Sequence, residues 1–179
     1  MKRAGHVAEI HGHKFWNSSF LVMEHLKRHP LPHEARVLEI GCGWGLLGLF
    51  CARQFGCRVH GIDADANVLP YLQLHAEING VRMTAARRTF EQMRVEDLRD
   101  FDLILGADIC FWDDMARQLY NLIRRARKAG VGQVIIADPC RPPFNALADR
   151  CAAQLEGVER RSARISRPVR ASGDLLILS

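Results

Sequence analysis

Short apolar runs alternate with longer segments of helical periodicity along most of this chain. The apolar runs lie at residues 36–40, 58–63, 101–107 and 133–138, with a weaker one at 83–89. Segments with apolar positions at helical spacing follow them, at residues 45–55, 67–78, 113–128 and 144–155. Strands that alternate with helices predict a doubly wound, mostly parallel sheet of the α/β class.

The two ends of the chain depart from this alternation. A polar start leads into a short amphipathic helix at residues 18–28, which the His-Pro-Leu-Pro segment at 29–32 ends. Near the other end, residues 158–164 and 174–179 are strand-like runs joined by the turn-rich stretch 166–173, with no helix between them. We therefore expect a C-terminal antiparallel hairpin, seven strands in all, and a three-layer α/β/α sandwich.

Length and composition favour a single domain. The chain has 179 residues, enough for one sizeable core, and no linker, repeat or low-complexity tract divides it. We expect one domain over residues 1–179, with a polar segment and helix at 1–35 and the α/β core at 36–179. No run approaches the ~18 apolar residues of a membrane span, so no membrane partner is expected. Six cysteines without a CxxC spacing predict reduced, packed thiols and a cytoplasmic location.

The formal net charge of +5 mildly favours an anionic partner. No motif reads bases, so nucleic acid is not expected as a partner, and a basic solvated surface is the simpler interpretation. Five arginines nevertheless crowd the predicted hairpin, which leaves an acidic protein or a phosphate-bearing substrate open: Arg160, Arg161, Arg164, Arg167 and Arg170. The histidines His6, His11 and His13 lack a helical i,i+4 pair with an acidic partner, so no metal site is expected.

A glycine-rich turn follows the first apolar run, where residues 37–45 read Val-Leu-Glu-Ile-Gly-Cys-Gly-Trp-Gly. A strand that turns sharply into a helix, with its backbone against a ligand, needs glycine at such positions. Glu39 is a carboxylate inside an apolar strand. We expect it to orient the glycine loop or a cofactor, with a cation pair or a cap on the loop as the alternative.

Asp63 ends the next apolar run, where a carboxylate can accept both hydroxyls of a ribose. Its alternative role as a helix N-cap falls more naturally to Asp65, which is closer to the following helix. A glycine turn and a carboxylate on the neighbouring strand together predict a site for an adenosine-bearing cofactor.

The acid-x-Gly-x-Gly-x-Gly motif at 39–45, the acid that ends the second strand and the terminal hairpin occur together. With them the chain resembles the class I, seven-strand, Rossmann-like S-adenosylmethionine-dependent methyltransferases over essentially its whole length. The resemblance implies S-adenosyl-L-methionine as cofactor, bound in this part of the chain by Glu39, Gly41, Cys42, Gly43, Asp63 and Ala64.

Two alternatives remain open. Residues 43–48 also satisfy GxGxxG, as in an NAD(P)-dependent oxidoreductase, although dinucleotide sites usually place the first glycine directly at the strand end. The second alternative is a non-catalytic protein that binds S-adenosylmethionine or a partner.

Asp108 follows the 101–107 run, at the sheet edge where ligands of open α/β folds bind. This stretch is similar to the branch that methylates protein lysines and related amines (methyltransferase family 16), whose fourth strand ends in an acid-x-x-Tyr motif. Ala107 and Asp108 fit that motif, but Phe111 replaces the tyrosine and lacks its hydroxyl. The resemblance implies a cofactor contact for Ala107, a catalytic Asp108 that aims an amine, and a substrate contact for Phe111.

Other segments are similar to the same branch. Trp16 lies in a Trp-x-x-Ser segment that would cover the cofactor, with an aromatic staple for the first helix as the alternative, and Phe90 matches an aromatic position near adenine. Residues 137–144 resemble an Asp-Pro-Gly-Arg segment of that branch, which implies that Asp138 and Arg141 line the substrate mouth. The following Pro142-Pro143 pair is predicted to be a rigid turn into the next helix. The expected function is methyl transfer to an amine of a protein, including a lysine, or of a small molecule.

Overall fold

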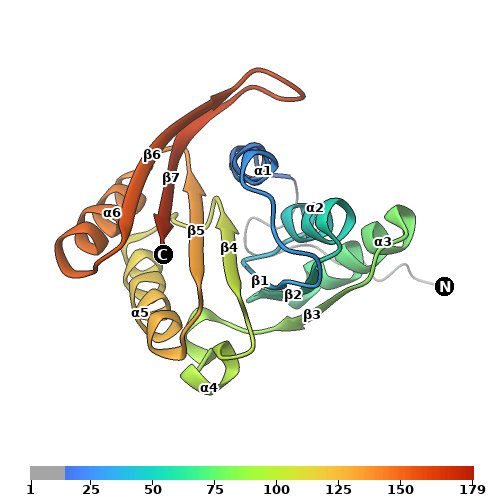
Figure 1. Ribbon diagram of the computed structural model, residues 1–179, viewed down its shortest axis with the longest axis horizontal. Helices are drawn as coiled ribbons and strands as arrows, with labels where there is room; N and C mark the ends of the chain where they lie inside the picture. Colours follow the sequence, from blue (N-terminus) through green and yellow to red (C-terminus); the bar gives the residue numbers. More distant parts are fainter. Residues whose placement is uncertain (1–14) are drawn as a thin grey trace.

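The computed structural model describes residues 15–179, which fold around one seven-stranded sheet (Figure 1). The strand order is β3-β2-β1-β4-β5-β7-β6. Strands β1 to β5 pair in parallel, and β7 runs antiparallel to both β5 and β6. The strands are β1 (Arg36–Ile40), β2 (Arg58–Asp63), β3 (Met83–Arg87), β4 (Leu103–Ala107), β5 (Gln133–Asp138), β6 (Val158–Ile165) and β7 (Ala171–Leu178).

Helices cover both faces of the sheet, because the central strands are apolar on both sides. Leu21 and Leu26 of α1 and Leu47 of α2 pack with one face of the central strands. Leu119 of α5 and Phe144 of α6 lie in the core on the other face. The helices are α1 (Ser18–Arg28), α2 (Leu46–Phe55), α3 (Leu69–Asn79), α4 (Val95–Leu98), α5 (Asp113–Ala129) and α6 (Pro142–Gln154), with short 3₁₀ turns η1 (Ala66–Val68) and η2 (Phe90–Gln92).

The structure confirms the predicted fold class, the seven strands and the terminal hairpin, and it corrects several boundaries. Strand β7 begins at Ala171 rather than at residue 174, because Gly173 pairs with Ala163 across the hairpin. A Cβ at Gly173 would lie 2.2 Å from the carbonyl oxygen of Asp138, so glycine here is a packing requirement rather than a turn signal. The two prolines at 142–143 are the first residues of α6 rather than a turn before it, since proline is tolerated at the start of a helix.

The β6–β7 hairpin packs beside α1, and its tip projects beyond the rest of the sheet (Figure 1). The sequence did not predict α4, because four residues are too few for a periodic pattern. All six cysteines are free thiols, and all but Cys140 are buried. None of the helices within residues 15–179 is both long and apolar enough to cross a membrane.

Candidate functional site

The turn from β1 into α2 is built from glycines with positive φ, at +59° for Gly41 and +50° for Gly43. A Cβ at Gly41 would lie 2.5 Å from Cγ2 of Ile109, so the loop after β4 packs directly on this backbone. A Cβ at Gly43 would meet no atom within 4 Å. The Gly43 backbone therefore faces open space, as a ligand cradle requires.

Asp63 joins this turn to the end of β2. Its Oδ2 accepts a hydrogen bond from the Gly43 N–H at 2.9 Å, and its Oδ1 accepts one from the Asp65 N–H at 2.9 Å. Burial raises the pKa of Asp63 above its ordinary value, and the backbone donors partly oppose this. Each oxygen keeps further lone pairs, so the carboxylate can also accept hydroxyl groups. Asp65, and not Asp63, caps η1 by accepting from the Asn67 N–H.

Glu39 lies beneath the turn and is 5% exposed. Its Oε2 accepts a hydrogen bond from the Gly48 N–H at 3.0 Å, which ties the first turn of α2 to β1. Burial raises the pKa of Glu39 to about 8, although the backbone donors of α2 oppose the rise. This geometry orients the glycine loop from below and gives Glu39 no place in the main cavity.

A cavity of about 260 Å³ opens above the glycine turn, between the ends of β1, β2 and β4 and the start of α5. It brings together nine of the predicted residues: Trp16, Gly41, Gly43, Asp63, Ala64, Phe90, Ala107, Asp108 and Phe111. Cys42 does not line this cavity but lines a small hollow beside it, together with Glu39. The Cys42 sulfur lies under the loop, where it would be 2.9 Å from a Cβ at Gly61.

Several lining residues were not predicted. Trp112 and Met115 follow Phe111 at the start of α5, and their i,i+3 spacing was an available signal that they face the same side. The remaining ones gave no sequence signal: Arg88, Ile109 and Gln118. Next to Phe90 in sequence, Thr89 also lines the cavity and Glu91 does not.

The composition of this cavity fits S-adenosylmethionine. Asp63 offers carboxylate lone pairs at the end of β2, the Gly43 backbone leaves room for close approach, and Phe90 gives an apolar wall. Arg125 fixes that wall, because its Nε donates to the Met93 carbonyl at 2.8 Å and its Nη2 to the Phe90 carbonyl at 2.7 Å. These residues would hold the ribose and the adenine ring.

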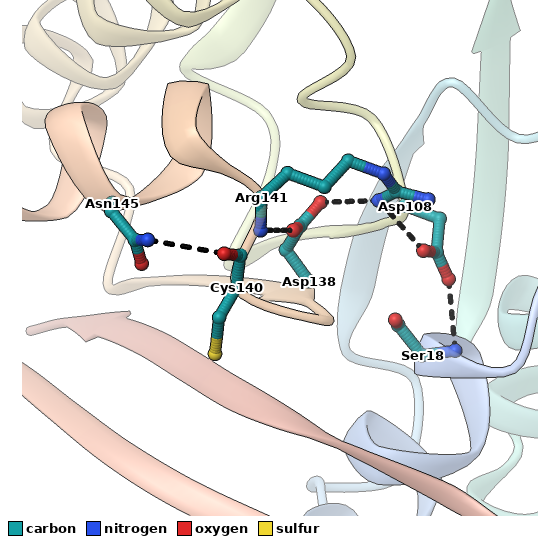
Figure 2. Close-up of polar contacts among 6 residues, drawn as sticks. All are labelled: Ser18, Asp108, Asp138, Cys140, Arg141 and Asn145. Atoms are coloured by element: carbon teal, nitrogen blue, oxygen red, sulfur yellow. Dashed lines mark hydrogen bonds and ion pairs between the residues drawn. The ribbon is translucent and has the colours of Figure 1, made fainter.

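Asp108 lies at the end of β4 and is 5% exposed, with a positive φ of 57°. Its Oδ2 accepts from the Ser18 N–H at 2.8 Å, and its Oδ1 accepts from Arg141 Nη1 at 2.9 Å (Figure 2). The same Nη1 donates to Asp138 Oδ2 at 2.6 Å, and the Arg141 N–H donates to Asp138 Oδ1 at 2.8 Å. One guanidinium therefore bridges the carboxylates that end β4 and β5.

Burial determines the roles of these charged groups. Asp138 is fully buried, so the expectation that it lines the substrate mouth is wrong: it lies behind Arg141 and holds it. Burial raises the pKa of Asp138, and Arg141 partly opposes this. Burial alone would lower the pKa of Arg141, but the two carboxylates raise it overall, so the guanidinium stays charged.

Arg141 also contacts the aromatic side chains at the mouth of the site. Its guanidinium carbon lies 4.4 Å from the Phe111 ring centroid and 5.7 Å from that of Trp16. The rings of Trp16 and Phe111 are themselves 5.3 Å apart in an edge-to-face arrangement. A second hollow, of about 380 Å³, adjoins this point and is lined by Trp16, Ser18, Asp108, Arg141, Arg170 and their neighbours.

No group of three or more His, Cys, Asp or Glu that could hold a metal occurs within residues 15–179. The cluster His6, His11 and His13 lies outside the described residues.

Comparisons with known proteins agree with this geometry. A family model described as "Methyltransferase domain" matches residues 37–130, more than half of the chain. The ubiquinone biosynthesis O-methyltransferase of Cereibacter sphaeroides is 40% identical over 81 residues, which cover 45% of this chain and 32% of that protein. The aligned region thus spans about a third of the length of such curated relatives.

Solved structures with the same fold include the ribosomal protein L11 methylase of Lactobacillus delbrueckii subsp. bulgaricus, with TM-score 0.66, 20% identity, and coverage of 91% of this chain and 79% of that one. They also include the tRNA (uracil-54, C5)-methyltransferase of Pyrococcus abyssi in complex with S-adenosyl-L-homocysteine, with TM-score 0.63, 17% identity, and coverage of 93% and 40%. The chain belongs to the class I methyltransferase domain family, whose cofactor is S-adenosylmethionine.

Proposed function

We propose that this protein transfers the methyl group of S-adenosylmethionine to an amine nitrogen held beside Asp108. One observation carries the proposal: Trp16 and Asp108 line both the cofactor cavity and the adjoining hollow. A carboxylate at the junction of two cavities can contact an acceptor that enters through one and a cofactor that fills the other. The carboxyl end of a central strand is where open α/β folds place such a group.

The bound cofactor supplies an electrophilic methyl group on a sulfonium. The lone pair of the acceptor nitrogen forms the new N–C bond, the S–C bond breaks with its electron pair left on sulfur, and the nitrogen loses one proton to water. Trp16 and Phe111 confine the acceptor and exclude water from it, so the chain contributes mainly orientation. The free lone pairs of Asp108 accept an acceptor N–H, and its charge stabilises the positive charge that develops on nitrogen.

The charges at the mouth favour an acceptor amine that is already neutral. The Arg141 guanidinium fills the position between Asp108, Asp138 and Phe111 that a lysine ammonium would otherwise take. A protein lysine, which the resemblance to the lysine branch suggests, would need to displace this guanidinium and would also find no hydroxyl at Phe111. A weakly basic amine needs neither displacement nor deprotonation, so it fits the mouth better.

An oxygen acceptor, as in the O-methyltransferases to which the chain is similar, is less well supported. A hydroxyl group must lose its proton to become a good nucleophile, which calls for a general base. No histidine within the described residues lines either cavity, and Asp108 already accepts bonds from Arg141 and Ser18.

The test is transfer of a tritiated methyl group from S-adenosylmethionine to fractions of a cell extract, with wild-type protein and an Asp108→Asn variant. We expect labelled product from the wild type and about 100-fold less from the variant, since one charge-matched contact contributes on the order of 3 kcal/mol. An Asp113→Asn variant removes a similar charge from the exposed start of α5 and should keep full activity.

Titration with S-adenosylhomocysteine checks that each variant keeps its cofactor site. Full activity of a folded Asp108→Asn variant would refute the role of Asp108. Label that never leaves the cofactor in any fraction would refute the transferase function and favour a protein that only binds S-adenosylmethionine.

A further inference from the structure

The arginines of the terminal hairpin fall into two groups. Residues 160–173 contain five arginines and no Asp or Glu. Arg160 donates from Nε to Asp174 Oδ2 at 2.6 Å, and Arg161 pairs with Glu159 at 2.8 Å. Within residues 15–179, Arg164, Arg167 and Arg170 have no such carboxylate partner. Three cations near the projecting hairpin tip are therefore left to face solvent or a ligand.

Two of these arginines line a continuous depression that leads to the proposed acceptor site. The hollow beside Asp108 and Arg141, of about 380 Å³, shares Arg170, Ala171 and Ser172 with a second hollow of about 370 Å³ that contains Arg164. The Asn17 side chain fixes the point where the two meet, because its Nδ2 donates to the Arg170 carbonyl at 3.2 Å. We call the line from Arg141 through Arg170 to Arg164 the arginine track.

Arg141 forms the inner end of this track, beside Asp108. Among its side-chain nitrogens, Nη1 donates to both Asp108 and Asp138 (Figure 2). Nε and Nη2 donate to no residue in the described part of the chain. The carboxylates and the Phe111 ring hold the guanidinium in one orientation. A guanidinium fixed in this way can bind a phosphate oxygen with little loss of side-chain entropy.

Aromatic side chains accompany the track where it reaches the cofactor cavity. Phe15, 43% exposed, lines the same hollow as Arg141, and Trp112, 52% exposed, lines the cofactor cavity beside Phe111. Trp16 lines both cavities. Arginines that follow a backbone, interleaved with aromatic rings on which bases stack, are the chemical pattern of a single-strand nucleic-acid site. Phe15 stacks on His75 and Trp112 contacts Phe111, and both rings keep exposed area on which a base can stack. An acidic peptide would pair with the arginines but offers no base to these rings.

We infer that the arginine track binds the phosphate backbone of a single-stranded nucleic acid, which presents a base amine to the methyl-transfer site. The inference rests on the proposed function for the identity of the acceptor, but the binding surface itself stands on the arginines and rings. An exocyclic base amine is uncharged at neutral pH, as the mouth requires. Its lone pair takes the methyl group, and one of its N–H protons leaves to water.

The experiment measures binding of a fluorescein-labelled 12-nucleotide RNA of mixed sequence by anisotropy over a range of salt concentrations, without methyl transfer. The test protein carries Arg164→Ala and Arg170→Ala. The control carries Arg82→Ala and Arg99→Ala, which remove the same charge from exposed positions outside the hairpin. We expect at least 10-fold weaker binding for the test protein only. Its slope of log K against log salt should fall by about 1.4, since each lost contact removes about 0.7.

Competition separates nucleic acid from acidic protein. Polyglutamate at equal charge concentration should displace the RNA poorly, because it offers no bases to stack. Equal displacement by polyglutamate, or unchanged RNA binding in the test protein, would overturn the inference. S-adenosylhomocysteine affinity should be the same in all proteins. Failure of the proposed function would instead appear as intact RNA binding without methyl transfer to any acceptor.

Discussion

Replacement of Glu39 by glutamine should change how the stability of this protein depends on pH. Burial raises the pKa of Glu39 from an ordinary value of 4.5 to about 8, so the folded protein holds this proton over a range in which the unfolded chain releases it. The stabilisation that comes from the neutral carboxyl group is complete below pH 4.5 and is lost as the pH rises toward 8. The full loss corresponds to about 5 kcal/mol.

Glutamine is neutral at every pH and keeps a side-chain oxygen that can accept from the Gly48 N–H. The free energy of unfolding of the wild type, measured with urea, should therefore fall relative to that of Glu39→Gln by about 3 kcal/mol between pH 5 and pH 7.5. The difference between the two curves isolates Glu39, because all other titrating groups are common to both proteins.

A Glu24→Gln variant is the matched control, since Glu24 is partly exposed on α1 and, among the described residues, pairs with Lys27 and Arg28. Its curve should run parallel to that of the wild type. If the curve of Glu39→Gln is also parallel to that of the wild type, Glu39 is ionised in the folded protein and burial does not raise its pKa.

Three further variants test the cofactor cavity and its support. Asp63→Asn should weaken S-adenosylhomocysteine binding by 10- to 100-fold in calorimetry, as loss of a charged hydrogen bond contributes about 1.5–3 kcal/mol, whereas Asp65→Asn keeps its cap and should bind nearly normally. Arg125→Met should weaken S-adenosylhomocysteine binding by roughly 10-fold, because the Phe90 carbonyl loses its donor. Arg124→Met, at the exposed neighbouring position, is the control, and equal effects of the two substitutions would contradict this role of Arg125. Gly48→Ala should destabilise the fold by about 1–3 kcal/mol in urea denaturation, since the new Cβ would lie 2.6 Å from Glu39 Oε2, and an unchanged midpoint would show that the core relaxes freely.

The parts of the site that lie on one strand and its following loop could be predicted from local pattern. The glycine turn, Asp63 and Asp108 each follow an apolar run, and parallel strands place such positions at one edge of the sheet. The structure places all three around one cavity for this reason.

The partners of these residues could not be predicted, because they come from distant segments. Ser18 and Asp108 are 90 residues apart, and Arg125 reaches back 35 residues to Phe90. Asp138 looked like a substrate contact in sequence, but the packing of Arg141 over it decides that it is buried.

The sequence alone determined the α/β class, the succession of strands and helices along the chain, and the cofactor loop. Each of these depends on short-range periodicity or on glycine conformations. Tertiary structure alone decided which charges meet beside Asp108 and which hairpin arginines lack a carboxylate partner within residues 15–179. Ion pairs form between side chains that only the packed sheet and hairpin bring within a few ångströms of each other, and local sequence carries no record of that distance.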